Sequence, residues 1–193
     1  MRIVAGSLRG RQIPSHPCLG SVRLTSARTK EAVFSMLGSD LQRLLFLDLC
    51  AGSGQIGLEA YSRGARIVLN EPDRRRYAQI RRLVAQWQLD DIELHSTRAE
   101  NLMPRLQAVG YRFDVVYLDP PYHARSSGQA LAARLLTQLG NTDILQSGAV
   151  ALVQHQADLD LPPASGMLQR GRQRTYGSTM LTIFHCITPR PAS

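Results

Sequence analysis

The feature that most constrains the fold is the stretch of residues 46–59, where an apolar run, a small-residue turn and a helical pattern follow one another. The apolar run, residues 44–49, has the length of a buried parallel strand. The turn Ala51-Gly52-Ser53-Gly54 comes next, and a helix is predicted near residues 55–62. A strand, a glycine turn and a helix N-terminus together present backbone N–H groups to a ligand. The stretch therefore predicts an α/β fold with a ligand site at this turn.

Two classes of ligand fit such a junction. The dinucleotide pattern G-x-G-x-x-G is matched by Gly52, Gly54 and Gly57. Its acidic residue, expected about 20 residues further on, is Glu71. Asp48, however, ends the strand, where its carboxylate repels a pyrophosphate but attracts the sulfonium and ammonium groups of S-adenosylmethionine. We therefore expect S-adenosylmethionine rather than NAD, the alternative being that Asp48 only caps the helix.

The residues expected to hold this ligand lie at the ends of two neighbouring strands. Glu71 closes the second predicted strand, where its carboxylate is expected to accept hydrogen bonds from both ribose hydroxyls. The alternative is that Glu71 caps the next helix, before Asp73. The predicted ligand-binding residues of this part of the chain are Asp48, Ala51, Gly52, Ser53, Gly54, Glu71 and Pro72.

After the glycine turn, strand and helix patterns alternate, which is typical of a mostly parallel sheet. Strands are predicted at residues 66–70, 92–95, 113–118 and 149–153, and an antiparallel pair at 167–174 and 179–186. The helix between the second and third strands places Tyr77, Ile80, Val84 and Trp87 on one face, with its arginines on the solvent side. We expect an N-terminal extension over residues 1–40, made of a small hairpin within residues 1–24 and a helix, and one domain over residues 41–188.

A second motif, Asp119-Pro120-Pro121-Tyr122, follows the strand at residues 113–118 and so lies at the same carboxyl edge as the glycine turn. Two adjacent prolines remove two N–H donors, so the segment offers acceptors: the Asp119 carboxylate and main-chain carbonyls. Such acceptors suit a substrate amine, and the Tyr122 ring offers a surface on which a base can stack. The alternative is an ordinary turn after a strand. The predicted catalytic residues are Asp119, Pro120 and Tyr122.

The net charge of the chain is +8, which favours a polyanionic partner. Basic residues are dense near the N-terminus, and we interpret them as a phosphate-contacting arm, the alternative being a solvated surface. The predicted RNA-binding residues are Arg2, Arg9, Arg11, Arg23, Arg28 and Lys30. Thr25 or Ser26 is predicted to cap a helix over residues 29–37 of this region.

These motifs resemble those of the class I S-adenosylmethionine-dependent N-methyltransferases. Two N-terminal segments, residues 2–11 and 23–34, narrow the resemblance to the bacterial 16S rRNA guanine-N2 methyltransferase family known as RsmD. The resemblance covers nearly the whole chain. It implies a Rossmann-like domain with a mostly parallel seven-stranded sheet and a C-terminal antiparallel strand pair. It also implies transfer of a methyl group from S-adenosylmethionine to the exocyclic N2 of one guanine in 16S rRNA, free or in a small-subunit assembly particle.

The sequence departs from the pattern of these enzymes at two places. Arg23-Leu24-Thr25 stands where the RsmD family usually has Arg-Pro-Thr. After the third strand, many related enzymes carry an acid or amide that meets the adenine amine, whereas this chain has Arg98-Ala99. Arginine has no acceptor to offer, so adenine would be met by main chain or by Glu100; Arg98 and Ala99 complete the expected ligand-binding set.

Two other functions remain compatible with the motifs: a DNA adenine N-methyltransferase, and a basic RNA-binding protein of the same fold without activity. The chain has three widely spaced cysteines and five histidines without ligand spacing, so neither a disulfide framework nor a metal site is predicted. No signal peptide or membrane-spanning run is found, so a cytoplasmic protein is expected. As a separate expectation, the protein acts as a monomer.

Overall fold

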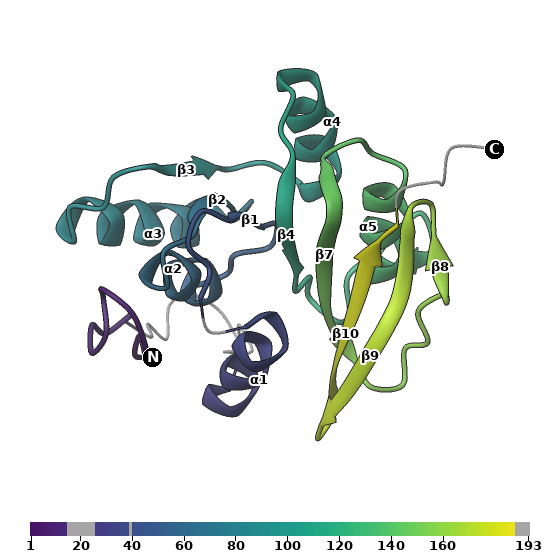
Figure 1. Ribbon diagram of the computed structural model, residues 1–193, viewed down its shortest axis with the longest axis horizontal. Helices are drawn as coiled ribbons and strands as arrows, with labels where there is room; N and C mark the ends of the chain where they lie inside the picture. Colours follow the sequence, from purple (N-terminus) through teal and green to yellow (C-terminus); the bar gives the residue numbers. More distant parts are fainter. Residues whose placement is uncertain (15–25, 39, 188–193) are drawn as a thin grey trace. The chain divides into compact units, whose positions relative to one another are not determined.

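The computed structural model describes residues 1–14, 26–38 and 40–187 of the 193-residue chain. The chain divides into two compact units, Met1–Arg98 and Ala99–Ser193, whose elements are labelled in Figure 1. The division therefore falls between Arg98 and Ala99, and residues 1–40 belong to the same unit as the glycine turn. Within the described ranges, no helix combines the length and the apolar character needed to cross a bilayer.

The first unit contains a parallel three-stranded sheet in the order β3-β2-β1. Its strands are β1 (Leu45–Asp48), β2 (Arg66–Asn70) and β3 (Ile92–His95), and its helices are α1 (Ala27–Leu37), α2 (Gln55–Ser62) and α3 (Arg74–Gln86). Helix α2 packs on β1 and β2 because the strands and the helix are both buried and largely apolar. The strand ends therefore bring their polar residues to one edge of this sheet.

The N-terminal residues close a hairpin-like loop on α2 and α3. The Ile3 N–H donates to the Arg11 carbonyl, and the Gly10 N–H donates to the Ile3 carbonyl, both over 2.9 Å. The buried apolar cluster beneath this loop consists of Ile3, Leu8, Ile13, Leu58 and Leu83. The predicted hairpin is therefore confirmed for residues 1–14, whereas its continuation to residue 24 lies outside the described residues.

The second unit contains strands in the order β4-β7-β10-β9-β8, in which only β4 and β7 run parallel. The strands are β4 (Phe113–Leu118), β7 (Leu145–Gln156), β8 (Ala164–Ser165), β9 (Leu168–Tyr176) and β10 (Thr179–Cys186). The helices are α4 (Ala99–Val109) and α5 (Leu131–Gly140), and a separate short ribbon joins β5 (Arg125–Ser126) to β6 (Gln129–Ala130).

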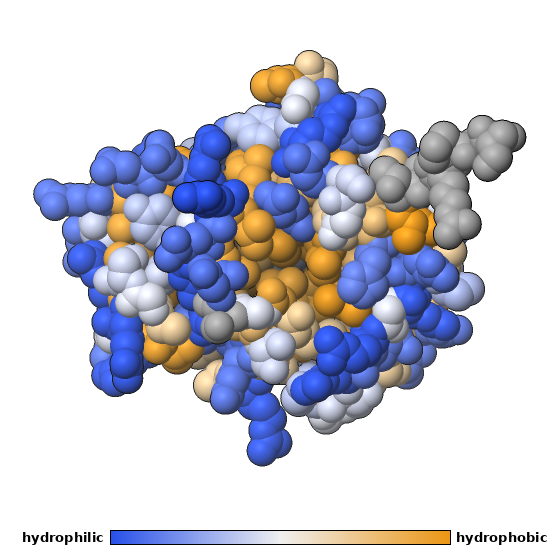
Figure 2. Space-filling model, viewed as in Figure 1, coloured by the Kyte–Doolittle hydropathy of each residue, from blue (hydrophilic) through white to orange (hydrophobic). Residues whose placement is uncertain are grey.

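Most predicted elements are confirmed, and the bounds of α2, β2, β3 and β4 agree with the prediction residue for residue. Ser26 caps α1, accepting a hydrogen bond from the Thr29 N–H over 3.0 Å. Strand β7 is longer than expected, and β5, β6 and β8 were not predicted because each has only two residues. The arginines of α3 are exposed apart from Arg76, and hydrophilic side chains cover this part of the molecule (Figure 2).

Candidate functional site

The turn between β1 and α2 depends on two glycines. Gly52 and Gly54 have φ angles of 57° and 78°, values that a residue with a Cβ atom rarely adopts. The Gly54 N–H donates to the Ala51 carbonyl over 2.7 Å, and the Ala51 N–H donates to the Asn70 carbonyl over 2.9 Å. The turn is therefore tied to the end of β2 and presents the N-terminus of α2 at the sheet edge.

Asp48 lies at the end of β1 and is only 1% exposed. Its Oδ2 atom accepts a hydrogen bond of 3.0 Å from the Gly57 N–H, in the first turn of α2. Gly57 permits this approach, because an added Cβ would lie 2.0 Å from the Leu69 side chain and 3.3 Å from Asp48 Oδ2. Asp48 thus accepts an N–H of the first helical turn, as its alternative role requires, and places negative charge at the positive end of the helix dipole.

Glu71 follows β2 and reaches back to the glycine turn. Its Oε2 atom accepts from the Gly52 N–H over 2.8 Å, and its Oε1 atom accepts from the Asp73 N–H over 2.9 Å. Asp73 caps α3, accepting from the N–H groups of Arg75 and Arg76 over 3.0 Å each, so Glu71 is not the cap of that helix. Burial raises the pKa of Glu71 above its ordinary value of 4.5, although the Asp73 N–H, Arg76 and the Gly52 N–H act in the opposite direction.

Asn70, which was not among the predicted site residues, fixes this edge from within. Its Nδ2 atom donates to the Leu49 carbonyl over 3.0 Å, and its Oδ1 atom accepts from the Thr97 N–H over 3.2 Å. The side chain is fully buried and joins the end of β1 to the segment after β3. The signal for this role was available in the sequence, since a polar amide follows the apolar run Ile67-Val68-Leu69 directly before Glu71.

The remaining predicted ligand-binding residues lie in different surroundings. Ser53 is buried within the turn, and Pro72 is exposed beside Glu71. Arg98 is the exposed last residue of the first unit, whereas Ala99 is the buried first residue of α4 in the second unit.

In the second unit, the segment Asp119-Pro120-Pro121-Tyr122 directly follows β4, as predicted. Pro120 is buried, Pro121 is exposed, and Asp119 and Tyr122 are half-buried. The Tyr122 hydroxyl donates to Thr179 Oγ1 over 3.0 Å, so the ring is anchored to the first residue of β10. The segment therefore combines a half-buried carboxylate with an aromatic ring whose position is fixed by a second strand.

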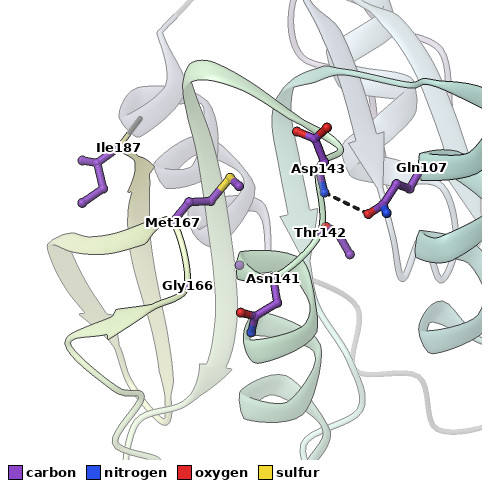
Figure 3. Close-up of a pocket in the computed structure, with 8 residues that line it drawn as sticks. Gln107, Asn141, Thr142, Asp143, Gly166, Met167 and Ile187 are labelled. Carbon is purple, nitrogen blue, oxygen red and sulfur yellow. Dashed lines mark hydrogen bonds between the residues drawn. The ribbon is translucent and has the colours of Figure 1, made fainter. Parts of the chain in front are cut away.

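Two cavities lie within the second unit. One, of about 380 Å³, borders the motif and is lined by Pro120, Pro121, Tyr122, His123, Arg125, Ala130, Ala132, His155, Gln156, Asp158 and Leu159. The other, of about 590 Å³, lies beside the start of β7 (Figure 3). In it the Asp143 N–H donates to Gln107 Oε1 over 2.9 Å. None of the predicted site residues lines this larger cavity, so the smaller one is the candidate for substrate contact.

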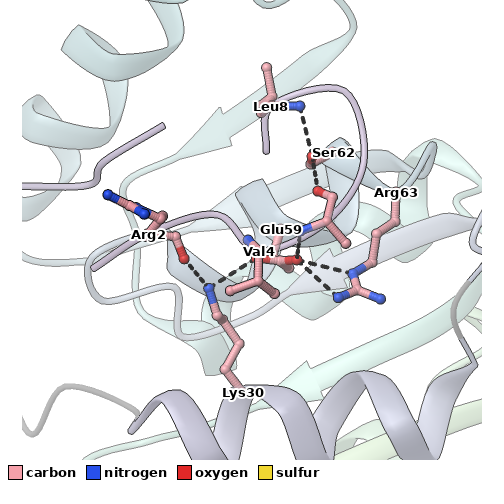
Figure 4. Close-up of polar contacts among 8 residues, drawn as sticks. Arg2, Val4, Leu8, Lys30, Glu59, Ser62 and Arg63 are labelled. Carbon is pink, nitrogen blue, oxygen red and sulfur yellow. Dashed lines mark hydrogen bonds and ion pairs between the residues drawn. The ribbon is translucent and has the colours of Figure 1, made fainter. Parts of the chain in front are cut away.

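Lys30 is a correction to the predicted RNA-binding set. Its side chain is 2% exposed, and its Nζ atom lies 2.9 Å from Glu59 Oε2 and donates to the Arg2 carbonyl (Figure 4). Glu59 is fully buried in α2 and also accepts from Arg63, over 3.0 Å, and from the N–H groups of Val4 and Ala5. The Lys30 charge therefore holds the N-terminal loop and α1 to α2 instead of facing a polyanion.

The other predicted RNA-binding residues differ from Lys30. Arg2, Arg9 and Arg28 are exposed. Arg11 is exposed too, but its guanidinium lies 5.4 Å from the centre of the Trp87 ring and donates to the Trp87 carbonyl over 3.4 Å, so it also packs against α3. Arg23 lies outside the described residues.

The chain is similar to known proteins over nearly its whole length. Ribosomal RNA small subunit methyltransferase D of Escherichia coli is 30% identical to it, over 95% of this chain and 89% of that protein. The structure of a hypothetical protein of Thermus thermophilus matches with a TM-score of 0.80 and 31% identity, over 95% of this chain and 98% of that one. An RNA methyltransferase from Salinibacter ruber, solved with S-adenosyl-L-homocysteine, matches with a TM-score of 0.65 at 16% identity, over 88% of this chain and 97% of that one.

The structural matches confirm the predicted Rossmann-like class I methyltransferase fold, with mostly parallel strands and an antiparallel C-terminal group. The model of the family described as Conserved hypothetical protein 95 matches residues 1–185. The chain therefore belongs to this family, which is the RsmD family that its sequence motifs resemble.

Proposed function

We propose that this protein transfers a methyl group from S-adenosylmethionine to the exocyclic N2 of a guanine in 16S rRNA. The observation that carries the proposal is the segment Asp119-Pro120-Pro121-Tyr122, which offers hydrogen-bond acceptors beside an aromatic ring held by Thr179. The name of the Escherichia coli relative, a small-subunit rRNA methyltransferase, supports RNA as the substrate. The basic balance of the chain, +8, agrees with a polyanionic substrate.

The residues around the glycine turn suit the methyl donor. Glu71 keeps lone pairs for ribose hydroxyls, because a carboxylate has about four acceptor sites and two backbone N–H groups occupy only two of them. Asp48 adds negative charge at the start of α2, which suits a cationic ligand and opposes a pyrophosphate. The donor supplies an electrophilic methyl carbon on a sulfonium sulfur. Asp48, Glu71 and the turn residues 51–54 are proposed to bind and orient it.

Asp119 is proposed to act on the substrate amine. The lone pair of an exocyclic base amine is delocalised into the ring, which makes the amine a poor nucleophile. When the Asp119 carboxylate accepts one N–H, the lone pair becomes more localised on nitrogen, and the interaction strengthens as positive charge develops there. A strong base is not required, because the methylated nitrogen becomes acidic and releases its proton after attack. The Pro120 backbone, without an N–H, keeps this place free of a competing donor.

Tyr122 is proposed to stack on the guanine and hold it in line for attack. Its hydroxyl is bonded to Thr179, so the ring is fixed before the substrate arrives and little ordering remains to be done on binding. Arg2, Arg9 and Arg28 of the N-terminal region are exposed and are proposed to contact RNA phosphates. A monomer acting on 16S rRNA, free or in an assembly particle, completes the proposal.

The decisive experiment is methyl transfer from labelled S-adenosylmethionine to 16S rRNA, to small-subunit particles and to duplex DNA. Digestion and mass spectrometry then identify the modified nucleotide. The proposal expects N2-methylguanine in RNA. Methyladenine in DNA would instead establish the adenine-specific alternative, and donor binding without transfer to any of these substrates would refute the enzymatic assignment.

A further inference from the structure

The last part of the chain contains arginines but no acidic residue of its own. Between Leu161 and Ser193 the sequence contains no Asp or Glu, and its arginines are Arg170, Arg172, Arg174 and Arg190. The first three of these lie on β9, an antiparallel strand of the second unit. Like charges that lie close together on one strand repel each other and raise the electrostatic energy of the fold. An anionic partner would offset this repulsion.

The three arginines of β9 differ in their contacts. Arg170 pairs with Asp160, with a distance of 3.0 Å between Nη1 and Oδ1, and also donates to the Leu161 carbonyl over 2.7 Å. Arg172 and Arg174 are exposed, and neither forms an ion pair with any residue that the structure describes. Their guanidinium groups are thus available to a ligand, whereas that of Arg170 serves the fold.

The outer edge of β9 is open where Arg172 and Arg174 lie. Strand β8 pairs with β9 at Leu168 and Gln169, and the Arg170 N–H donates to the Pro163 carbonyl over 2.8 Å. Beyond Arg170, the described chain gives β9 a strand partner on the β10 side alone. Gly171 marks a bulge opposite Ile183, and an added Cβ at Gly171 would lie 2.8 Å from the His185 ring. In Figure 1, β9 forms one side of the C-terminal hairpin, and Figure 2 shows hydrophilic side chains in this region.

Strand pairing places Arg174 on the same face as the candidate catalytic segment. Tyr176 is directly opposite Thr179, so their side chains share one face of the sheet. Thr179 Oγ1 accepts the hydrogen bond from Tyr122, which brings the tyrosine of the motif to this face. Arg174 is two residues from Tyr176 and projects from the same face, at a rise of about 7 Å along the strand.

We propose that Arg172 and Arg174 form an RNA-contacting surface of β9, which binds backbone phosphates of the nucleotides flanking the target base. The inference rests on the proposed function, because this surface would bind the same RNA whose target base stacks on Tyr122. Arginine suits this task because its planar guanidinium binds phosphate oxygens in a bidentate manner. A different role for charge on an open strand edge is to prevent pairing with another copy of the chain.

The test replaces Arg172 and Arg174 together by glutamine and compares this variant with Arg81→Gln/Arg82→Gln. The control removes the same charge from two exposed arginines of α3. RNA affinity, its dependence on salt, donor affinity and sedimentation are measured for both. The β9 variant is expected to bind RNA about 2- to 30-fold more weakly. The slope of its log affinity against log salt should fall by about 1.4 to 1.8 relative to wild type, with donor affinity unchanged. Arg172→Lys/Arg174→Lys should recover most of the salt slope.

Two outcomes would overturn this inference, and a third would refute the proposed function. A β9 variant whose RNA affinity and salt slope equal those of the control overturns the inference while the wild-type enzyme still methylates RNA. Self-association of the β9 variant with unchanged RNA affinity assigns the arginines to edge protection and likewise overturns it. Failure of the wild-type protein to methylate RNA refutes the proposed function itself, which separates that failure from the other two.

Discussion

Glu59→Gln tests the buried ionic network that joins the N-terminal loop to α2. The substitution preserves size but removes the negative charge that faces Lys30, whose side chain is 2% exposed. It also sets an amide N–H group against the Val4 and Ala5 N–H donors, which Glu59 now accepts over 2.9 Å and 3.1 Å. Removing one partner of a buried ion pair costs about 3–5 kcal/mol. A loss of this size is a large part of the about 5–15 kcal/mol that stabilises a domain.

Urea unfolding followed by far-UV circular dichroism measures this loss. Trp87, the only tryptophan of the chain, gives a second and local signal, because it packs against the apolar cluster under the N-terminal loop. Glu31→Gln is the matched control: it removes an acid of the same type from the exposed surface of α1. It should change the unfolding free energy by less than about 0.5 kcal/mol.

Lys30→Met completes a double-mutant cycle with Glu59→Gln. In the double variant no charge is left buried without a partner at Lys30, so the combined loss should be smaller than the sum of the single losses, by about 0.5–3 kcal/mol. Additive losses, or a Glu59→Gln protein as stable as wild type, would show that the network does not stabilise the fold as its geometry implies.

The remaining predictions concern the donor and RNA sites. Asp119→Ala should lower single-turnover methyl transfer by about 10²–10³ with donor affinity unchanged, and Asp119→Asn should retain more activity because its amide oxygen still accepts; equal losses would make the charge itself essential. Glu71→Ala should weaken donor binding in calorimetry by about 2–4 kcal/mol, and an unchanged affinity would remove Glu71 from the site. Because burial holds the pKa of Glu71 above 4.5, and only the ionised carboxylate accepts from both hydroxyls, wild-type donor affinity should fall as pH is lowered toward that raised pKa, at higher pH than for an ordinary glutamate. Arg9→Gln/Arg28→Gln should weaken RNA binding and reduce its dependence on salt concentration. An unaltered salt dependence would show that both residues are only part of the solvated surface.

The positions of the helices and strands could be predicted from local sequence patterns, but the roles of the charged residues could not. Strand β2 and helix α2 have clear patterns of hydrophobic residues and turn residues at both ends, so their bounds were predicted correctly. Lys30 was assigned to RNA because charge density near the N-terminus says nothing of a partner 29 residues away. Two unusual residues could have suggested this ion pair. Lys30 is the only lysine of the chain, and Glu59 is an acid within a helix whose other residues are mostly small or apolar.

Similar reasons explain the partial success at the ligand site. Asp48 and Glu71 were placed at strand ends by the sequence, and both lie there. Their hydrogen bonds to Gly57 and Gly52 depend on the exact path of the turn, which residue patterns do not encode. The bond between Tyr122 and Thr179 joins residues 57 positions apart, so the anchoring of the ring required tertiary structure.

The Glu59 network joins residues that the ribosome adds to the chain several seconds apart. The N–H groups of Val4 and Ala5 are among the first parts of the chain to be made, yet the carboxylate that accepts them is added 55 residues after Val4. At a synthesis rate of about 5–20 residues per second, the N-terminal loop waits about 3–11 seconds for its acceptor. During that interval Ile3, Leu8 and Ile13 have no α2 to cover them. Until Leu58 of α2 and Leu83 of α3 have been made, the nascent chain therefore carries an apolar segment without its native cover, and apolar surface that is exposed during folding is prone to aggregate.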